Sequence, residues 1–286
     1  MPCDVARIKR IAARMRSDIL RMITLAGSGH PGGSLSAADI VATLFFGDVL
    51  RYRADEPDWP QRDRFILSKG HAAPVLYAAL AQAGYFEADE LSTLRKLGSR
   101  LQGHPDSNKL PGVEVATGSL GQGLSIAAGL AYGLRASGQT TQQVYVLLGD
   151  GELQEGQVWE AAMFAAHKRL GNLVAIVDNN NLQIDGSLDE VMSLGDIASR
   201  FAVFGFKTLE IDGHDILSLQ KALTEGAAYR DGPVAIIAHT VKGKGVSFME
   251  NQCGWHGKAP SPELCDAALA ELAPLCEQGE GAHDGR

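Results

Sequence analysis

The residues best suited to chemistry follow two apolar segments that we expect to be neighbouring strands. Val144–Leu148 leads into a Gly-Asp-Gly turn around Asp150, and Leu173–Val177 leads into a run of asparagines that includes Asn180. If both segments are parallel strands joined by a helix, these side chains emerge at the same carboxyl edge of a sheet, where open α/β folds bind ligands. A carboxylate and an amide oxygen are hard ligands suited to Mg²⁺, which usually completes its octahedron with phosphate oxygens and water.

The glycines on either side of Asp150, Gly149 and Gly151, would let the backbone approach a diphosphate closely. The helix expected after them would offer unpaired N–H donors to the same anion. Either the Gly-Asp-Gly segment or the asparagine run alone is more often an ordinary turn. Together, at the spacing of a strand–helix–strand unit, they favour a metal and diphosphate site.

Four of the eight histidines lie in loops beside glycine, proline or tryptophan, namely His30, His71, His104 and His256. Stiff neighbours hold a loop side chain in place, and loops carry many binding residues. Because an unperturbed imidazole has a pKa of about 6.5, it can exchange protons with substrate hydroxyls near neutrality. The spacing of these histidines matches no compact zinc pattern, so the Asp/Asn oxygen pair and Mg²⁺ explain the site better.

The other histidines are weaker candidates. His167 lies in a helical segment, where a surface or packing role is expected, and His283 belongs to the polar end of the chain. His214 stands beside Asp215 at a predicted helix start, which indicates local capping. His239 ends a predicted strand, and its role stays open.

Five apolar segments without polar alternation are predicted strands: Phe65–Leu67, Val144–Leu148, Leu173–Val177, Phe206–Ile211 and Val234–Ala238. This pattern is typical of a parallel sheet covered on both faces. Helical patterns separate them: Ala72–Ala83, Leu120–Ala136, Gly156–Leu170, Ser193–Phe204 and Asp215–Arg230. The alternation predicts an α/β fold, a doubly wound parallel sheet with helices on both faces and right-handed crossovers.

The two ends of the chain differ in character. Val5–Leu25 is an amphipathic helix, and a second helix is expected after Ser34 or Ser36, either of which could cap it. Pro262–Leu275 is a last short helix. We expect one domain over residues 1–275 and a disordered polar tail over residues 276–286.

Composition excludes several classes of protein. The 286 residues are 45% hydrophobic and 21% charged with a net charge of −8, which suits one large α/β domain. The chain has no basic stripe for nucleic acid, no apolar run long enough for a membrane, and no signal-peptide core at its start. Its four scattered cysteines favour a reducing compartment, so we expect a cytoplasmic protein.

Six segments, in register, resemble the transketolase family of thiamine diphosphate enzymes. They are Ser28-Gly-His-Pro-Gly-Gly-Ser, Ser68-Lys-Gly-His-Ala, Gly103-His-Pro, Thr117-Gly-Ser-Leu-Gly-Gln-Gly, Gly149-Asp-Gly-Glu-Leu-Gln-Glu-Gly and Ile184-Asp-Gly. The likeness runs from about Ile8 to about His256, nearly the whole chain. The resemblance implies the thiamine diphosphate-binding fold and, within it, the diphosphate-binding domain.

The resemblance also implies cofactor-binding residues. The metal, Mg²⁺ with Ca²⁺ or Mn²⁺ as possible substitutes, would be bound by the side chains of Asp150 and Asn180 and by the carbonyl oxygen of Leu182. The residues implied to contact thiamine diphosphate are His71, Gly118, Leu120, Gly149, Asp150, Gly151, Glu152, Asn180, Ile184 and His256. Among them, Gly118 and Leu120 would act through backbone atoms, and Ile184 would pack against the cofactor's rings.

Catalytic roles follow from the same resemblance. His30, His104 and His256 would face the sugar, and Glu155 would approach a subunit interface near the cofactor, with Glu160 a weaker candidate. In transketolases the glutamate that activates the cofactor lies on a second, pyrimidine-binding domain, which the matched segments do not include. The resemblance therefore implies the N-terminal subunit of a split transketolase that is inactive alone; a shortened form of a one-chain enzyme is the alternative.

The resemblance further implies that the chain assembles with a C-terminal subunit, which carries the pyrimidine-binding and C-terminal domains, in an expected A2B2 complex. This complex would move a two-carbon ketol unit from a ketose phosphate to an aldose phosphate.

Three alternative functions remain open. Half of another thiamine diphosphate enzyme, similar to deoxyxylulose-phosphate synthase or to the 2-oxo acid dehydrogenase α subunit, would share the metal motif but not the Ser-Gly-His-Pro-Gly-Gly and Gly-His-Pro segments as a set. A non-catalytic relic has no need of intact ligands. A dinucleotide-binding dehydrogenase would need a buried strand before Gly118.

Overall fold

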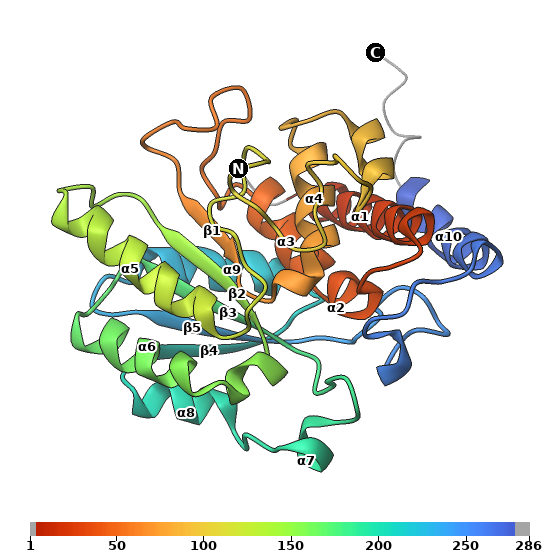
Figure 1. Cartoon of the computed structure of the whole chain (residues 1–286). Coiled ribbons are helices and arrows are strands. Elements are labelled where there is room, and N and C mark those ends of the chain that lie inside the picture. Colours follow the sequence, from red (N-terminus) through yellow and green to blue (C-terminus); the bar gives the residue numbers. More distant parts are fainter. Residues whose placement is uncertain (1–3, 278–286) are drawn as a thin grey trace.

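The computed structural model describes residues 4–277 and arranges five parallel strands in the order β1-β2-β3-β5-β4 (Figure 1). All four neighbouring pairs are parallel. The strands are β1 (Arg64–Leu67), β2 (Val144–Gly149), β3 (Leu173–Asn179), β4 (Lys207–Asp212) and β5 (Val234–His239). Each begins and ends within two residues of its predicted bounds, so the predicted parallel sheet is confirmed.

The helices lie in two layers on either side of this sheet (Figure 1). Helices α1, α3, α4 and α9 cover one face, whereas α5, α6 and α8 cover the other. Their bounds, with those of the shorter helices, are α1 (Val5–Ala26), α2 (Pro31–Ser36), α3 (Ala38–Phe46), α4 (Ala73–Gln82), α5 (Gln122–Ala136), α6 (Gly156–His167), α7 (Leu188–Val191), α8 (Ile197–Val203), α9 (Ile216–Ala228) and α10 (Pro262–Glu277), with 3₁₀ turns η1 (Gly70–Ala72), η2 (Ala88–Thr93), η3 (Gly151–Gln154) and η4 (Cys253–Trp255).

Strand β2 shows why the apolar runs lack polar alternation. Tyr145 and Leu147 belong to the core beneath α1, α3 and α4, whereas Val144, Val146 and Leu148 belong to the core beneath α5 and α6. Because successive side chains of a strand point to opposite faces, both sets must be apolar when helices cover both faces. The sheet is therefore the doubly covered layer that the sequence predicted.

Strand β4 departs from the prediction of a buried strand. Leu209 and Ile211 are only half-buried, and Glu210 and Asp212 are exposed. In the described part of the chain, β4 lies at an edge of the sheet and pairs with β5 alone, but β1, at the other edge, is buried. The difference is in the sequence, since Lys207, Thr208 and Glu210 interrupt the apolar residues of β4 and indicate a partly exposed strand.

The prediction that Ser34 or Ser36 caps the second helix is wrong. Helix α2 begins at Pro31 and contains both serines, and Ala37 precedes α3. The Ser34 hydroxyl donates to the carbonyl of His30 at 2.7 Å, and the Ser36 hydroxyl donates to the carboxylate of Asp178 at 2.5 Å. A proline at the first helical position, with its preset φ, starts α2 instead.

The last helix continues beyond the predicted end at Leu275. Helix α10 ends at Glu277 and packs against α1, so Cys276 and Glu277, expected in the tail, are helical. The rest of the predicted tail, residues 278–286, lies outside the described residues. Over residues 4–277, no helix is both long and apolar enough to cross a bilayer.

Candidate active site

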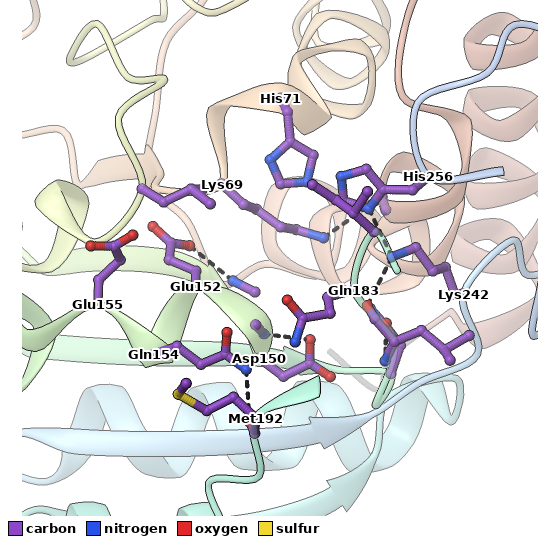
Figure 2. A pocket seen from close by; sticks show the side chains of 17 residues that line it. Lys69, His71, Asp150, Glu152, Gln154, Glu155, Gln183, Met192, Lys242 and His256 are labelled. Atoms are coloured by element: carbon purple, nitrogen blue, oxygen red, sulfur yellow. Dashed lines mark hydrogen bonds between the residues drawn. The ribbon is translucent and has the colours of Figure 1, made fainter. Parts of the chain in front are cut away.

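A cavity of about 420 Å³ opens at the carboxyl ends of β2 and β3 (Figure 2). In the register of these strands, Gly149 pairs with Asp178, so Asp150 and Asn180 follow on adjacent strands. The predicted residues that line the cavity are His71, Leu120, Gly149, Asp150, Gly151, Glu152, Glu155, Asn180, Leu182, Ile184 and His256. His30, His104 and Gly118 are not among its lining residues.

Two oxygen-bearing side chains, those of Asp150 and Asn180, line the cavity at this sheet edge. The Asp150 carboxylate, which is buried, accepts hydrogen bonds from the backbone N–H groups of Gly151 at 2.8 Å and of Asn181. The side-chain oxygen of Asn180 accepts from the N–H of Leu182 at 3.2 Å. Burial, and then the carboxylate of Asp178, raise the pKa of Asp150 to about 6. A carboxylate held in such surroundings is stabilised by a nearby cation.

The cavity wall suits a divalent cation with a diphosphate. Asp150, Asn180 and Leu182 offer a carboxylate, an amide oxygen and a backbone carbonyl, the oxygen donors that Mg²⁺ prefers. The amide nitrogen of Gln183 is buried without a hydrogen-bond partner in the described part of the chain, which leaves a donor for a ligand. A Cβ at Gly151 would lie 3.3 Å from the Cβ of Gln183, so a side chain at this position would narrow the cavity that both residues line. The side chains of Asp150 and Asn180 therefore fit the cation, and the carbonyl of Leu182, which accepts from Lys242 at 2.8 Å, fits it once this ammonium turns to the diphosphate.

Two lysines supply positive charge to the cavity. The ammonium of Lys69 is buried, pairs with the carboxylate of Asp178 and donates to the carbonyl of Gly33 at 2.7 Å. Burial raises the pKa of Asp178, but Lys69 and the hydroxyl groups of Ser36 and Thr240 together outweigh burial and lower this pKa. The ammonium of Lys242 donates to the carbonyl of Leu182 at 2.8 Å, and burial lowers the pKa of Lys242 to about 8. Both ammonium groups could bind phosphate oxygens.

Three histidine rings gather beside these lysines. Ring centroids lie 5.2 Å apart for His30 and His71, 5.6 Å for His30 and His256, and 5.2 Å for His71 and His256. Burial, followed by neighbouring positive groups, lowers the pKa of His30 to about 4 and of His256 to about 3, and lowers that of His71 well below its usual value. These imidazoles are therefore neutral near pH 7, and each can both donate and accept a hydrogen bond.

His104 and Gly118 adjoin this histidine group from outside the cavity. A Cβ at Gly118 would lie 3.2 Å from the ring of His104, so the two loops touch there. Burial and the nearby Arg95 lower the pKa of His104. The positive form of His104 also disfavours protonation of His30. The predicted histidines thus occupy one region, with His104 on its outer side.

The two acidic candidates differ in their surroundings. Glu152 is buried, and its carboxylate accepts from the hydroxyl of Ser68 and from the N–H groups of Gly121 at 2.8 Å and Gly149 at 3.0 Å. It thereby holds the loop before α5 against the end of β2. Glu155 is exposed on the cavity rim, at the position before the first residue of α6. Figure 2 shows both side chains on the same side of the cavity.

The prediction that His214 caps a helix locally is wrong. The N-cap of α9 is Asp215, whose side chain accepts from the N–H of Ser218 at 3.2 Å. The His214 ring instead lies 2.7 Å from the carboxylate of Asp39 and 2.8 Å from the N–H of Val241. These partners are remote in sequence, so local pattern could not indicate them.

The other two described histidines lie away from the cavity lining. His239 is exposed at the end of β5, within 3.2 Å of the side chains of Asn179 and Glu210. His167 is exposed at the end of α6, in agreement with its expected surface role. His283 is outside the described residues.

A comparison with models of known protein families identifies the family of this chain. The model of the family described as transketolase, thiamine diphosphate binding domain, matches residues 8–270 of the chain. The chain belongs to the transketolase family. The match includes every cavity-lining residue named above.

Relatives of two lengths resemble this transketolase-family chain. It is 39% identical to the 6-deoxy-6-sulfo-D-fructose transketolase subunit SqwG of Clostridium sp. (strain MSTE9), over 92% of this chain and 97% of the relative. It is 38% identical to one of the subunits of the apulose-4-phosphate transketolase of Phocaeicola vulgatus, over 99% of this chain and 100% of the relative. Human transketolase is 43% identical, but the match covers 93% of this chain and only 42% of the human protein.

A solved structure has the same architecture. The crystal structure of transketolase from Campylobacter jejuni aligns with a TM-score of 0.88 and 33% identity, covering 96% of this chain and 43% of that one. The transketolase-family fold predicted from the sequence is therefore confirmed. The chain corresponds to a little under half of such long transketolases.

The two cavity lysines were not predicted as site residues. Lys69 lies inside the Ser-Lys-Gly-His segment of the transketolase resemblance, which was a usable signal. Lys242 lies in Thr240-Val-Lys-Gly-Lys-Gly, where nothing separates it from an ordinary surface lysine. Its burial reveals its place in the cavity.

Proposed function

We propose that this chain is the thiamine diphosphate- and Mg²⁺-binding subunit of a two-chain transketolase. With a second subunit that carries the pyrimidine-binding and C-terminal domains, it would transfer a two-carbon ketol unit from a ketose to an aldose as an A2B2 complex. The observation that carries this proposal is the cavity that joins Asp150, Asn180 and Leu182 to a group of neutral histidines, in a chain of this family.

The relatives support a split enzyme. Two of them are named as transketolase subunits, and the match covers 97% and 100% of their lengths. The substrates in their names, a sulfonated fructose and apulose 4-phosphate, differ from each other. For this chain we therefore propose a sugar substrate that carries a phosphate or a sulfonate group.

The rim of the cavity supports a docked partner. Ile184 is 65% exposed and Met192 is 61% exposed, although both line the cavity. Exposed apolar side chains beside a polar binding site are typical of a surface that another chain covers. We propose that the partner's pyrimidine-binding domain covers this rim, beside Glu155, and completes the site from the open side.

This chain would anchor the cofactor. The oxygens of Asp150, Asn180 and Leu182 would hold Mg²⁺, while Lys69 and Lys242 would offset the charge of the diphosphate. Thiamine diphosphate, when bound, supplies the carbanion chemistry of ketol transfer.

The histidines would act on the substrate and on the diphosphate. His30, His104 and His256 would exchange protons with hydroxyl groups of the sugar, since the lowered pKa values of these rings keep them neutral at pH 7. His71 would donate a hydrogen bond to the diphosphate, together with the N–H of Gly151.

Reconstitution tests the proposal. The chain is mixed with thiamine diphosphate, Mg²⁺, a ketose phosphate donor and an aldose acceptor, with and without the C-terminal subunit of a split transketolase. We expect the two-carbon-extended product only when both subunits are present. If this chain alone turned over the substrates as fast as the mixture of both subunits, the split site would be contradicted. If no combination with a partner subunit formed the product, the proposed activity would be contradicted.

Two variants serve as controls for the reconstitution. Asp150→Ala should abolish turnover of the mixed subunits, because it removes a metal ligand. Asp266→Ala, at an exposed residue of α10 that does not line the cavity, should leave the assembly and its product pattern close to those of the wild type. Replacing the donor by pyruvate separates a ketol transfer from the chemistry of the other thiamine diphosphate enzymes.

A further inference from the structure

The ring of His214 joins two segments that are far apart in the sequence. On one side, the Nδ1 atom lies 2.7 Å from the carboxylate of Asp39 on α3, a residue 175 positions away. On the other side, the Nε2 atom accepts the backbone N–H of Val241 at 2.8 Å. The ring is nearly buried, with 14% of its side chain exposed.

These contacts indicate which tautomer the ring adopts. A backbone N–H can only donate, so Nε2 must be the unprotonated nitrogen that accepts from Val241. The proton of the neutral ring is then on Nδ1, where the Asp39 carboxylate accepts it. Asp39 is held in turn by the guanidinium of Arg16, which binds it through two N–H groups at 3.1 and 2.6 Å. A carboxylate on one nitrogen commonly orients a histidine whose other nitrogen does the work.

The segment that His214 holds carries a cavity lysine. Val241 directly precedes Lys242, whose ammonium contacts the Leu182 carbonyl at 2.8 Å and the His256 ring at 3.0 Å. Neighbouring N–H groups of this segment are bound by backbone: that of Thr240 by the Asn179 carbonyl, and that of Gly243 by the Gly32 carbonyl. For Val241 the corresponding acceptor is a side chain, the imidazole of His214.

We propose that His214 is a positioning residue, which sets the place of Lys242 in the cavity by holding the backbone at Val241. Arg16 and Asp39 orient the ring, and the ring binds the backbone N–H of Val241. Because Val241 is bonded to Lys242, its position determines where the ammonium group of Lys242 lies. This role goes beyond the anchoring of the diphosphate, and its functional consequence rests on the proposed function of the cavity. His214 itself does not line the cavity.

Hydrogen exchange tests the mechanical part without any ligand. In the full-length chain, His214→Phe keeps a ring of similar size but removes both nitrogens. We expect exchange of the backbone amides in residues 240–243 to accelerate at least tenfold, while those of β2 and β3 keep their protection. His214→Gln, which retains an acceptor and an N–H donor, should give intermediate exchange. His167→Phe, at an exposed site, is the control and should leave the segment unchanged.

Calorimetric titration with thiamine diphosphate and Mg²⁺ tests the functional part. His214→Phe should bind the cofactor about tenfold more weakly, which corresponds to about 1.4 kcal/mol, although the substituted residue does not line the cavity. His214→Gln should recover part of the affinity. A titration in which the wild type binds no cofactor would refute the proposed function, whereas the exchange data would still decide the positioning role.

Two results would overturn the inference. Unchanged exchange of residues 240–243 in His214→Phe would show that the ring does not hold the backbone at Val241. Equal acceleration in β2 and β3, with His214→Gln behaving in the same way, would show that His214 supports the whole fold and has no specific effect on Lys242.

Discussion

Replacing Gly123 by alanine should destabilise the chain, whereas the same substitution at Gly129, on the same helix, should stabilise it. A Cβ at Gly123 would lie 2.3 Å from the Oγ of Ser68, 2.4 Å from its Cβ and 2.7 Å from its Cα. At Gly129 a Cβ would meet no atom within 4 Å. Both positions are inside α5, so the helix propensity of alanine changes by a similar amount in each variant.

The expected magnitudes follow from these distances. Overpacking typically costs about 1–3 kcal/mol, and the upper end applies at Gly123 because the backbone of Ser68 must move as well. Alanine gains about 1 kcal/mol over glycine inside a helix. The net change is therefore a loss of about 2 kcal/mol for Gly123→Ala and a gain of about 1 kcal/mol for Gly129→Ala.

Urea unfolding of the isolated chain measures both changes. With an m-value of about 3 kcal/mol/M, the unfolding midpoint should fall by roughly 0.7 M in Gly123→Ala and rise by roughly 0.3 M in Gly129→Ala. Because Ser68 donates to Glu152 at the cavity, Gly123→Ala should also weaken binding of thiamine diphosphate. Equal midpoints for the two variants would refute the claim that close packing of α5 on Ser68 requires glycine.

Three further predictions concern charge and chemistry. Asp39→Asn should flatten the acid side of the curve of stability against pH. Burial raises the pKa of Asp39, but Arg16 and His214 together outweigh burial and lower this pKa to about 2, so the stabilisation of about 2 kcal/mol is complete above pH 4 and is lost as the pH falls through 2. Thermal melts of the variant with the wild-type pH slope would contradict this. Lys242→Met should weaken binding of thiamine diphosphate at least tenfold, and the affinity of the wild type should fall above pH 8, where this lysine loses its charge. Equal affinities of the variant and the wild type in calorimetry at pH 7 would exclude Lys242 from the site. In the assembled enzyme, His104→Asn should lower kcat about 100-fold with unchanged cofactor affinity, whereas His71→Asn should mainly weaken cofactor binding. Steady-state rates and cofactor titrations measure both effects, and a loss of cofactor affinity in His104→Asn with a loss of kcat alone in His71→Asn would contradict these roles.

The sheet and the polar edge that lines the cavity could be predicted because their signals are local. Continuous apolar runs predict strands buried on both faces, and the polar residues that follow them must emerge at the carboxyl edge. Asp150 and Asn180 lie after adjacent strands for this reason and line one cavity. Their binding of a metal stays a prediction. The partial exposure of β4 was missed, although Lys207, Thr208 and Glu210 interrupt its apolar residues and indicate a strand that is not buried on both faces.

The missed features depend on contacts between distant residues. The pair of Lys69 and Asp178 joins residues 109 positions apart, and His214 reaches Asp39 across 175 positions. No periodicity or motif spacing indicates such pairs. In the same way, Ser36 was expected to cap a helix, but its hydroxyl binds Asp178, a partner 142 positions away. Local propensity gives way to tertiary hydrogen bonding at these positions.

Calorimetric titration of the wild-type chain and of Asp150→Ala with thiamine diphosphate, with and without Mg²⁺, tests the central claim most directly. The account predicts binding by the wild type that depends on Mg²⁺, and loss of this dependence in Asp150→Ala. Asn180→Ala should behave in the same way. Mg²⁺-dependent binding of equal affinity in the wild type and in Asp150→Ala would contradict the assignment of the cofactor to this edge of the sheet.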